Sequence, residues 1–285
     1  MTRPERGERL IRLALLVVAF SAVSILLVIT LFIFSEGTPI MFRHGLSKFL
    51  FSLDWFPLEK SYGLLPMIIG SLFVTAGSLV IGVPFGLSCA IILTEFSSPR
   101  LCRILKPVIE LLAGIPSVVY GFIGVVILVP FIRDRLGGPG LSVLAASIIL
   151  GIMILPTIIS ISIDSLEAVP RSYREGSIAL GATRWQTTRM VMFPAAKSGI
   201  IASIILGMGR AIGETMAVIM IAGNAAAIPR SLLDPVRTLT SNIALEMGYA
   251  AGEHREALFA TGVILFIIIM VLNTIANLTS KRRKP

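Results

Sequence analysis

Residues 13–34 read LALLVVAFSAVSILLVITLFIF, and this apolar run contains no charged side chain. A helix of about 20 apolar residues is long enough to cross the hydrocarbon core of a bilayer. The run is too long for the apolar core of a secretory signal, and no cleavage site of small residues follows it. We therefore expect a first transmembrane helix that stays attached to the chain as an anchor.

Five further apolar runs follow this first one. They cover approximately Leu64–Leu93, Val108–Ile132, Leu141–Ile163, Ser198–Ala222 and Ala257–Leu278. The chain is 55% hydrophobic and only 14% charged, with a mean hydropathy of +0.90, whereas soluble domains carry about 25% charged residues. The sequence therefore predicts an all-α, polytopic membrane protein with six transmembrane helices.

The basic residues are distributed unevenly over the segments between the spans. With the amino terminus inside, the cytoplasmic segments hold about twice as many Lys and Arg residues as the external ones. This bias predicts that both termini are cytoplasmic, and it accounts for the net charge of +9. A nucleic-acid surface is not expected, because no contiguous basic stretch with aromatic stacking partners occurs.

The predicted spans divide the chain into three parts. Residues 1–63 form an N-terminal head, the first transmembrane helix and the first external loop. Residues 64–278 form a five-helix membrane domain with a cytoplasmic loop at about 164–197, and residues 279–285 form a basic tail. In the first external loop, Trp55 and Tyr62 are candidate anchors at the membrane interface.

Motifs for enzymatic chemistry do not occur in the sequence. There is no phosphate-binding loop of the form G-x-x-x-x-G-K-[ST], no H-E-x-x-H, no nucleophile elbow and no C-x-x-C. The two histidines, His44 and His254, are distant from each other and from the cysteines. We therefore expect no catalytic residue, no metal ligand and no cofactor bound by this chain. Its energy would come from an ion gradient or from a separate subunit.

The longest cytoplasmic segment contains YREGSIALGATRWQT at residues 173–187. Pro170 suits the start of a helix, and Gly181 can adopt the left-handed conformation that ends one. Small residues at Gly176 and Ser177 would let another protein approach closely. The pattern predicts two short helices broken at Gly181, with an ordinary amphipathic loop as the alternative.

The spacing Glu175-Gly-Ser-x3-Gly181, followed by Phe193-Pro194, resembles the EAA loop of ABC importer permeases. That family has two alanines after the glutamate, where this chain has two other small residues. The resemblance implies that the loop inserts into a cleft of a separate ATP-binding subunit and transmits its motion. The residues that it assigns to this coupling loop are Glu175, Gly176, Ser177, Ala179, Gly181, Ala182, Thr183 and Arg184.

Two ionisable residues lie within the fifth predicted span, in the stretch GMGRAIGETM. Arg210 and Glu214 are four residues apart, so on a continuous helix they share one face and can pair. In a structural interpretation, the pair neutralises itself beside the close-contact stripe of Gly209 and Gly213. In a functional interpretation, Arg210 offers a planar set of N–H donors to an oxyanion. Glu214 then orients Arg210, or accepts a hydrogen bond from a protonated phosphate oxygen. Because a charge at mid-span costs at least about 2.5 kcal/mol, we assign Arg210, Glu214 and Thr215 to substrate translocation.

Proline residues predict breaks in two other spans. Gly114 and Pro116 indicate a kinked helix in the third span, which membrane proteins tolerate where polar groups line a cavity. Ser117 and Tyr120 would then face that cavity, or else pack within the protein. Pro156 predicts a similar break in the fourth span.

Three stretches together resemble the permeases of phosphate ABC importers. They are GIPSVVYG at 114–121, EGSIALGATRWQ at 175–186 and GRAIGETMA at 209–217. The resemblance extends from about Leu64 to Asn277, and it implies a type I ABC importer permease architecture with phosphate transport by alternating access. The external segments near Trp55 and His254 resemble the PstC-type subunit more than its PstA-type sister.

The resemblance also implies partners and a location. A PstC-like and a PstA-like chain would form a heterodimer in the bacterial inner membrane. Two PstB-like subunits would bind ATP and Mg²⁺, and a PstS-like protein would deliver phosphate from outside. Other functions stay open at this point: transport of sulfate or molybdate, the PstA-type role, an ion-coupled secondary carrier, and a scaffold that senses phosphate without translocating it.

Overall fold

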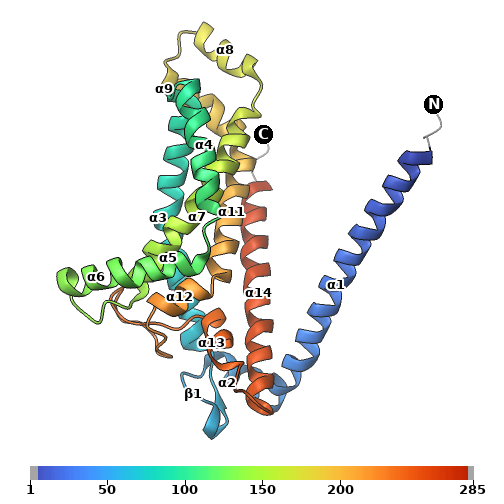
Figure 1. The fold of residues 1–285 in the computed structure, drawn as a ribbon, viewed down its shortest axis with the longest axis vertical. Coiled ribbons are helices and arrows are strands. Elements are labelled where there is room, and N and C mark those ends of the chain that lie inside the picture. Colours follow the sequence, from blue (N-terminus) through green and yellow to red (C-terminus); the bar gives the residue numbers. More distant parts are fainter. Residues whose placement is uncertain (1–5, 282–285) are drawn as a thin grey trace.

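The computed structural model describes residues 6–281 and is almost entirely helical (Figure 1). The long helices are α1 (Arg6–His44), α3 (Leu65–Ile91), α7 (Val143–Glu167), α11 (Lys197–Gly213) and α14 (Glu253–Lys281). The shorter helices are α2 (Leu46–Phe51), α4 (Pro99–Ala113), α5 (Ser117–Ile123), α6 (Val129–Leu136), α8 (Arg171–Ala179), α9 (Arg184–Thr187), α10 (Phe193–Ala195), α12 (Met216–Ile221) and α13 (Leu239–Glu246). The predicted all-α fold is confirmed.

Irregular turns and one small hairpin connect these helices. The π-helical turns are η2 (Ile92–Phe96), η3 (Gly124–Leu128) and η4 (Thr188–Met192), and η1 (Pro57–Glu59) is a 3-10 turn. The strands β1 (Trp55–Phe56) and β2 (Ser61–Tyr62) pair antiparallel. The start of the predicted head, at 1–5, and most of the predicted basic tail, at 282–285, lie outside the described residues.

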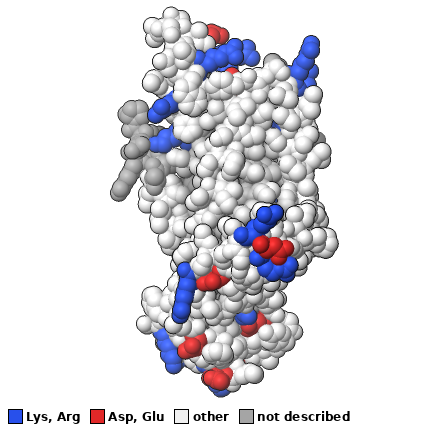
Figure 2. Space-filling model, turned by 90° about the vertical axis from the view of Figure 1, so that its left-hand side faces the viewer, with Lys and Arg blue, Asp and Glu red and all other residues white. Residues whose placement is uncertain are grey.

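The connecting segments gather at two opposite ends of the helical bundle. The start of α1, the end of α14, α8 and α9 lie at one end, which we call the terminal end (Figure 1). The hairpin, α2 and α13 lie at the other, which we call the distal end. On the face drawn in Figure 2, charged side chains lie near the top and over the lower half, and an uncharged band lies between these two regions. This distribution suits a protein whose middle is covered by lipid.

Within residues 6–281, five helical segments are long and apolar enough to cross a bilayer. They are Ile11–His44, Leu65–Phe96, Ser117–Leu136, Val143–Glu167 and Glu253–Ala276. The pair Arg184–Ala195 and Lys197–Gly213, bent by 72°, makes six if it is counted as one span. The six predicted spans therefore each have a counterpart.

The break predicted at Gly114 and Pro116 is present, but the start of the third span, the cavity beside it and the break in the fourth span need correction. The third span begins at Ser117 rather than near residue 108, because α4 is a separate helix that ends before Gly114 and Pro116. The Tyr120 hydroxyl donates to the carbonyl of Leu112 at 2.9 Å, so this buried side chain packs across the break and does not face a cavity. In α7, the helix continues through Pro156, and the predicted break there is wrong.

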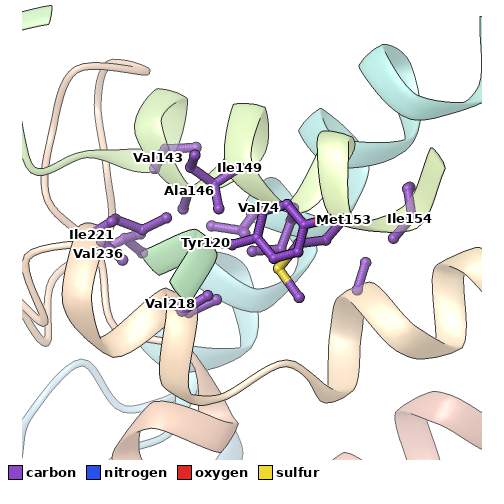
Figure 3. Packing of buried hydrophobic residues seen from close by; sticks show 14 of the residues in the cluster. Val74, Tyr120, Val143, Ala146, Ile149, Met153, Ile154, Val218, Ile221 and Val236 are labelled. Carbon is purple, nitrogen blue, oxygen red and sulfur yellow. The ribbon is translucent and has the colours of Figure 1, made fainter. Parts of the chain in front are cut away.

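The centre of the bundle is formed by α3, α7 and α11, which pack along one another. Small residues allow this close approach: a Cβ atom at Gly77 of α3 would overlap the side chain of Ser147 on α7. Figure 3 shows the apolar cluster at this junction, where Val74, Ile149 and Val218 come from three different helices. Burial of these side chains fixes the position of the segment that follows α11.

The first helix packs on the bundle only near the distal end. There, Phe32 and Phe34 lie edge-on against Phe259 and Phe266 of α14. Toward the N-terminus α1 diverges from the bundle (Figure 1), and its apolar side chains from Ile11 to Phe32 are exposed. An apolar surface of this extent requires lipid or another protein to cover it.

The interfacial roles expected for Trp55 and Tyr62 are wrong. Both side chains are buried in a distal apolar cluster that also contains Phe49 and Leu258. The short hairpin folds back onto α13 and α14, so it places the two rings inside the protein. Both rings are therefore part of the packed region at the distal end formed by α2, the hairpin and α13, which we call the distal cap, and are not exposed to lipid headgroups.

Candidate functional site

The fifth span is interrupted at the residues assigned to substrate translocation. Helix α11 ends at Gly213, Glu214 has an extended backbone with φ −69° and ψ 132°, and α12 begins at Met216. The Glu214 carboxylate accepts the backbone N–H of Ala217 at 3.2 Å, which satisfies a free donor at the start of α12. From α13, the Thr240 hydroxyl donates to the Glu214 carbonyl at 2.9 Å. The break is therefore held by specific hydrogen bonds.

This break separates the two charges that were expected to pair. Because the helix does not continue to residue 214, Arg210 and Glu214 do not share a helical face, and the predicted pairing is wrong. Arg210 instead reaches the hydroxyl of Thr157 on α7, with a distance of 3.5 Å between Nη1 and Oγ1. Among the side chains that the structure describes, no carboxylate forms an ion pair with Arg210. Its side chain is half-buried and keeps most of its donors free.

The surface beside Arg210 is open within this chain. A Cβ atom at Gly209 or Gly213 would meet nothing within 4 Å, so the expected close-contact stripe is not used for packing among the described residues. By contrast, Gly207 on the same helix lies against Ile158 of α7. Thr215 lies at the break and its hydroxyl donates to the Gly213 carbonyl at 3.3 Å. The structure thus brings Arg210, Glu214 and Thr215 to one open, broken segment.

The loop at the terminal end folds as two short helices broken at Gly181, as predicted. Pro170 precedes α8, and Gly181 has φ +82°, the left-handed conformation that lets the chain turn after the helix. Thr183 begins α9 with a capping box, because its hydroxyl accepts from Gln186 N and the Gln186 side chain accepts from Thr183 N. Local sequence therefore specifies both helices and the turn.

The outer surface of this loop carries several large apolar side chains among polar ones. Tyr173, Ile178, Leu180 and Trp185 are all exposed, with Leu180 at 91%. A Cβ atom at Gly176 would meet nothing within 4 Å. Of the other residues assigned to the coupling loop, four are exposed: Glu175, Ala179, Thr183 and Arg184. Ser177 and Ala182 are half-buried. Exposed apolar groups on a short protruding helix are typical of a docking surface.

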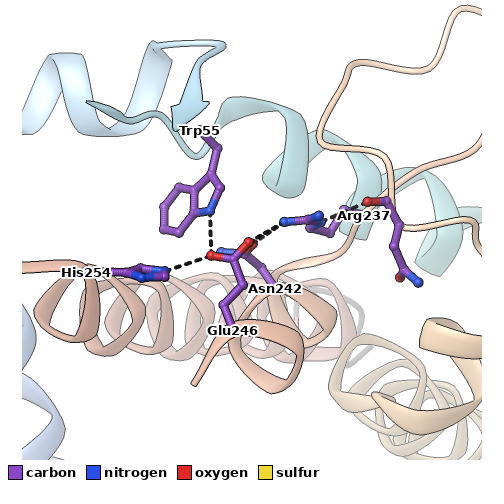
Figure 4. Close-up of polar contacts among 6 residues, drawn as sticks. Trp55, Arg237, Asn242, Glu246 and His254 are labelled. Atoms are coloured by element: carbon purple, nitrogen blue, oxygen red, sulfur yellow. Dashed lines mark hydrogen bonds and ion pairs between the residues drawn. The ribbon is translucent and has the colours of Figure 1, made fainter. Parts of the chain in front are cut away.

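A buried polar cluster at the distal end was not predicted (Figure 4). The Glu246 carboxylate accepts from Trp55 Nε1 at 2.9 Å and from Arg237 Nη1 at 2.7 Å, and His254 Nε2 lies 2.8 Å from it. Arg237 also donates to the side chain of Asn242 at 3.1 Å. The cluster joins the hairpin, the loop before α13, α13 itself and α14. In the sequence, Trp55 stood out as a candidate interfacial anchor, and the segments near Trp55 and His254 as resembling one subunit type. The separation of these residues in sequence concealed the contact with Glu246.

A second ion pair fixes α4 near the terminal end. Lys106 Nζ lies 2.9 Å from Asp164 of α7. The hydrogen bond to Asp164 raises the pKa of Lys106 above its ordinary value, although partial burial acts in the opposite direction. Lys106 is therefore charged at neutral pH and ties α4 to α7.

Comparison with known proteins places this architecture in a family. Residues 82–285 match the family described as binding-protein-dependent transport system inner membrane component. The chain belongs to this family, and its fold is that of an ABC importer permease.

Individual relatives extend the comparison to nearly the whole chain. The probable ABC transporter permease protein YqgH of Bacillus subtilis (strain 168) is 43% identical over 98% of this chain and 91% of its own length. The phosphate transport system permease protein PstC of Pasteurella multocida (strain Pm70) is 37% identical, covering 82% of this chain and 80% of that protein. A chain of a bacterial ABC transporter involved in the import of the acidic polysaccharide alginate has the same fold, with a TM-score of 0.65 and 17% identity over 99% and 100% of the two chains.

Proposed function

We propose that this chain is the PstC-type permease subunit of an ATP-driven importer that moves inorganic phosphate inward by alternating access. The observation that carries the proposal is the unpaired, half-buried Arg210 beside a break in a membrane span. An unneutralised guanidinium at this depth is costly and therefore favours a functional role. The names of similar proteins support phosphate as the substrate.

The chemistry of the broken segment suits a hydrogen phosphate ion. The guanidinium of Arg210 offers a planar set of N–H donors that matches two phosphate oxygens. Glu214 uses one carboxylate oxygen to cap α12, which leaves the other as an acceptor for a protonated phosphate oxygen. Sulfate is fully ionised at neutral pH and has no such proton, so this acceptor discriminates against it. The Thr215 hydroxyl adds a further polar group at the break.

We propose that the complete transporter contains three other kinds of subunit. A PstA-like permease would cover the open face at Gly209 and Gly213 and complete the pathway. Two PstB-like subunits would bind ATP and Mg²⁺ and receive α8 and α9, whose exposed apolar residues suit a protein cleft. A PstS-like protein would deliver phosphate at the distal end. This chain itself would bind no cofactor and catalyse no reaction.

In this arrangement the terminal end faces the cytoplasm of a bacterial cell and the distal end faces outward across the inner membrane. The bias of Lys and Arg toward the segments at the terminal end supports this orientation. Closure of the ATPase subunits would push on α8 and α9 and open the pathway to the outside. Hydrolysis would return it to the inward-open state.

Phosphate uptake in cells tests the proposal. A strain lacking this chain would be complemented with wild type, Arg210→Ala or Arg103→Ala, and labelled phosphate uptake measured with and without excess sulfate. Arg103 is a matched control because it is exposed on α4 and forms no ion pair within the described residues. We expect wild type and Arg103→Ala to restore sulfate-resistant uptake, and Arg210→Ala to assemble with the ATPase subunit but not transport. Uptake that sulfate blocks, or that does not depend on the chain, contradicts phosphate as the substrate.

A further inference from the structure

Helix α8 has two distinct faces. Seven of the nine residues of α8 are exposed, and only Arg174 and Ser177 are half-buried. Because these two positions are three residues apart, they lie on the same side of the helix. Tyr173 and Ile178 carry exposed apolar side chains instead. Helix α8 therefore presents one face outward, and the side chains of Arg174 and Ser177 on its other face point toward the rest of the protein.

The two inward side chains have different partners. The Ser177 hydroxyl lies 3.0 Å from the Thr187 hydroxyl of α9, so it ties α8 only to its own loop. The Arg174 guanidinium donates to Glu95, in the π-helical turn η2 that continues α3. Among the described residues, Arg174 is the one α8 side chain with a hydrogen bond or ion pair to a membrane-spanning segment. A displacement of α8 therefore reaches α3 through this contact.

The Glu95 end of the contact is firmly held. Its side chain is only 6% exposed, whereas that of Arg174 is 40% exposed. An ionised carboxylate at that burial is costly without its partner, so Glu95 favours keeping the guanidinium within reach as α8 moves. The turn η2 also packs against α7 and α4, and π-helical turns within helices are frequent at functional sites. Helix α3 in turn packs along α7 and along α11, which carries Arg210.

We propose that the Arg174–Glu95 ion pair transmits displacement of α8 to α3, and so makes Arg174 a positioning residue that couples ATP hydrolysis to opening of the pathway. The inference rests on the proposed transport function. Docking of α8 uses its exposed face, whereas transmission uses the opposite face. Removal of the ion pair therefore uncouples the two activities while the ATPase subunit stays bound.

The test uses the complete purified transporter in proteoliposomes, with its partner permease, ATPase subunits and phosphate-binding protein. Phosphate accumulated per ATP hydrolysed is measured for wild type, for the double variant Arg174→Gln with Glu95→Gln, and for the reversed pair Arg174→Glu with Glu95→Arg. The double glutamine variant leaves no unpaired buried charge. Arg103→Gln is the matched control, because Arg103 is exposed on α4, outside the docking face of α8, and has no ion pair among the described side chains.

We expect the double glutamine variant to retain the ATPase subunit but to move about tenfold less phosphate per ATP. The reversed pair recovers most of that loss, and Arg103→Gln matches wild type. The inference is overturned if the double glutamine variant keeps the wild-type ratio, if it loses the ATPase subunit, or if the reversed pair recovers nothing. A wild-type transporter that hydrolyses ATP but accumulates no phosphate contradicts the proposed function instead.

Discussion

The indole Nε1 of Trp55 donates a hydrogen bond to Glu246 at 2.9 Å and joins two segments that are 191 residues apart in sequence. The same carboxylate is the counter-ion of Arg237, and both charged side chains are largely buried. A buried charge that loses its partner destabilises a protein by about 3–5 kcal/mol. Removal of Glu246 alone is therefore expected to be costly, because it leaves the charge of Arg237 buried without its partner.

We expect Glu246→Ala to lower the thermal stability of the purified chain more than any single change at the surface of the cap. It removes the partner of Arg237 and costs about 3–5 kcal/mol, whereas Trp55→Phe removes one neutral donor and costs about 1–2 kcal/mol. The exposed pair of Lys60 and Glu253 supplies the control, with a cost for Lys60→Ala of about 1 kcal/mol or less. Melting temperatures in detergent measure the order, and equal shifts for Glu246→Ala and Lys60→Ala contradict it.

Substitutions at two glycines separate the shape of the coupling loop from its docking surface. Gly181→Ala forces a side chain into a backbone with φ +82°, which costs about 1 kcal/mol and alters the turn between α8 and α9. Gly176→Leu meets nothing within 4 Å in this chain, so we expect it to fold normally but to block entry of α8 into a cleft. Co-purification of the ATPase subunit measures docking. A Gly176→Leu variant that still binds the ATPase subunit shows that α8 does not enter a narrow cleft.

Two further glycines distinguish the open face of α11 from the packed centre. Gly77→Leu would overlap Ser147, so we expect loss of the folded chain. Gly213→Leu has free space in this chain, and we expect the chain to fold but not to associate with its partner permease or to transport. Expression level, followed by co-purification of the two permease chains, measures both effects. Normal association and transport in Gly213→Leu would mean that the partner does not cover this face.

The Lys106–Asp164 pair predicts a stability difference that does not change with pH near neutrality. The folded pKa of Lys106 is raised, so its contribution is fully present below the ordinary value of 10.5 and is lost only as pH rises through the raised value. We expect Lys106→Gln to cost about 1 kcal/mol or less, because Asp164 is mostly exposed. The difference from wild type should be the same at about pH 6 and about pH 8. A difference that disappears at the higher pH indicates another titrating group.

Local and compositional features of the chain were predictable from sequence. The long apolar runs specify spans because a bilayer admits few alternatives to a helix. The two short helices of the coupling loop follow from Pro170, Gly181 and the capping residues at Thr183, all of which act within a few residues along the chain. These features depend little on tertiary contacts.

The remaining features depend on contacts that are distant in sequence. The end of α11 at Gly213 is held by Thr240 from α13, so helical spacing alone paired Arg210 with Glu214 incorrectly. Trp55 is buried because Glu246 and α14 lie beside it, although its flanking sequence is typical of a membrane interface. The spacing of residues along the chain does not predict such contacts, because they form only when distant segments pack together.

The most direct test of the central claim is ATP-driven phosphate accumulation by the purified four-component transporter in sealed vesicles, with an uncoupler present throughout. The account predicts accumulation that requires ATP, persists with the uncoupler and excess sulfate, and is lost in Arg210→Ala although the subunits remain assembled. Accumulation that the uncoupler abolishes and ATP does not drive would contradict the account, since it would identify an ion-coupled carrier. Full transport by Arg210→Ala would contradict the role assigned to the broken span.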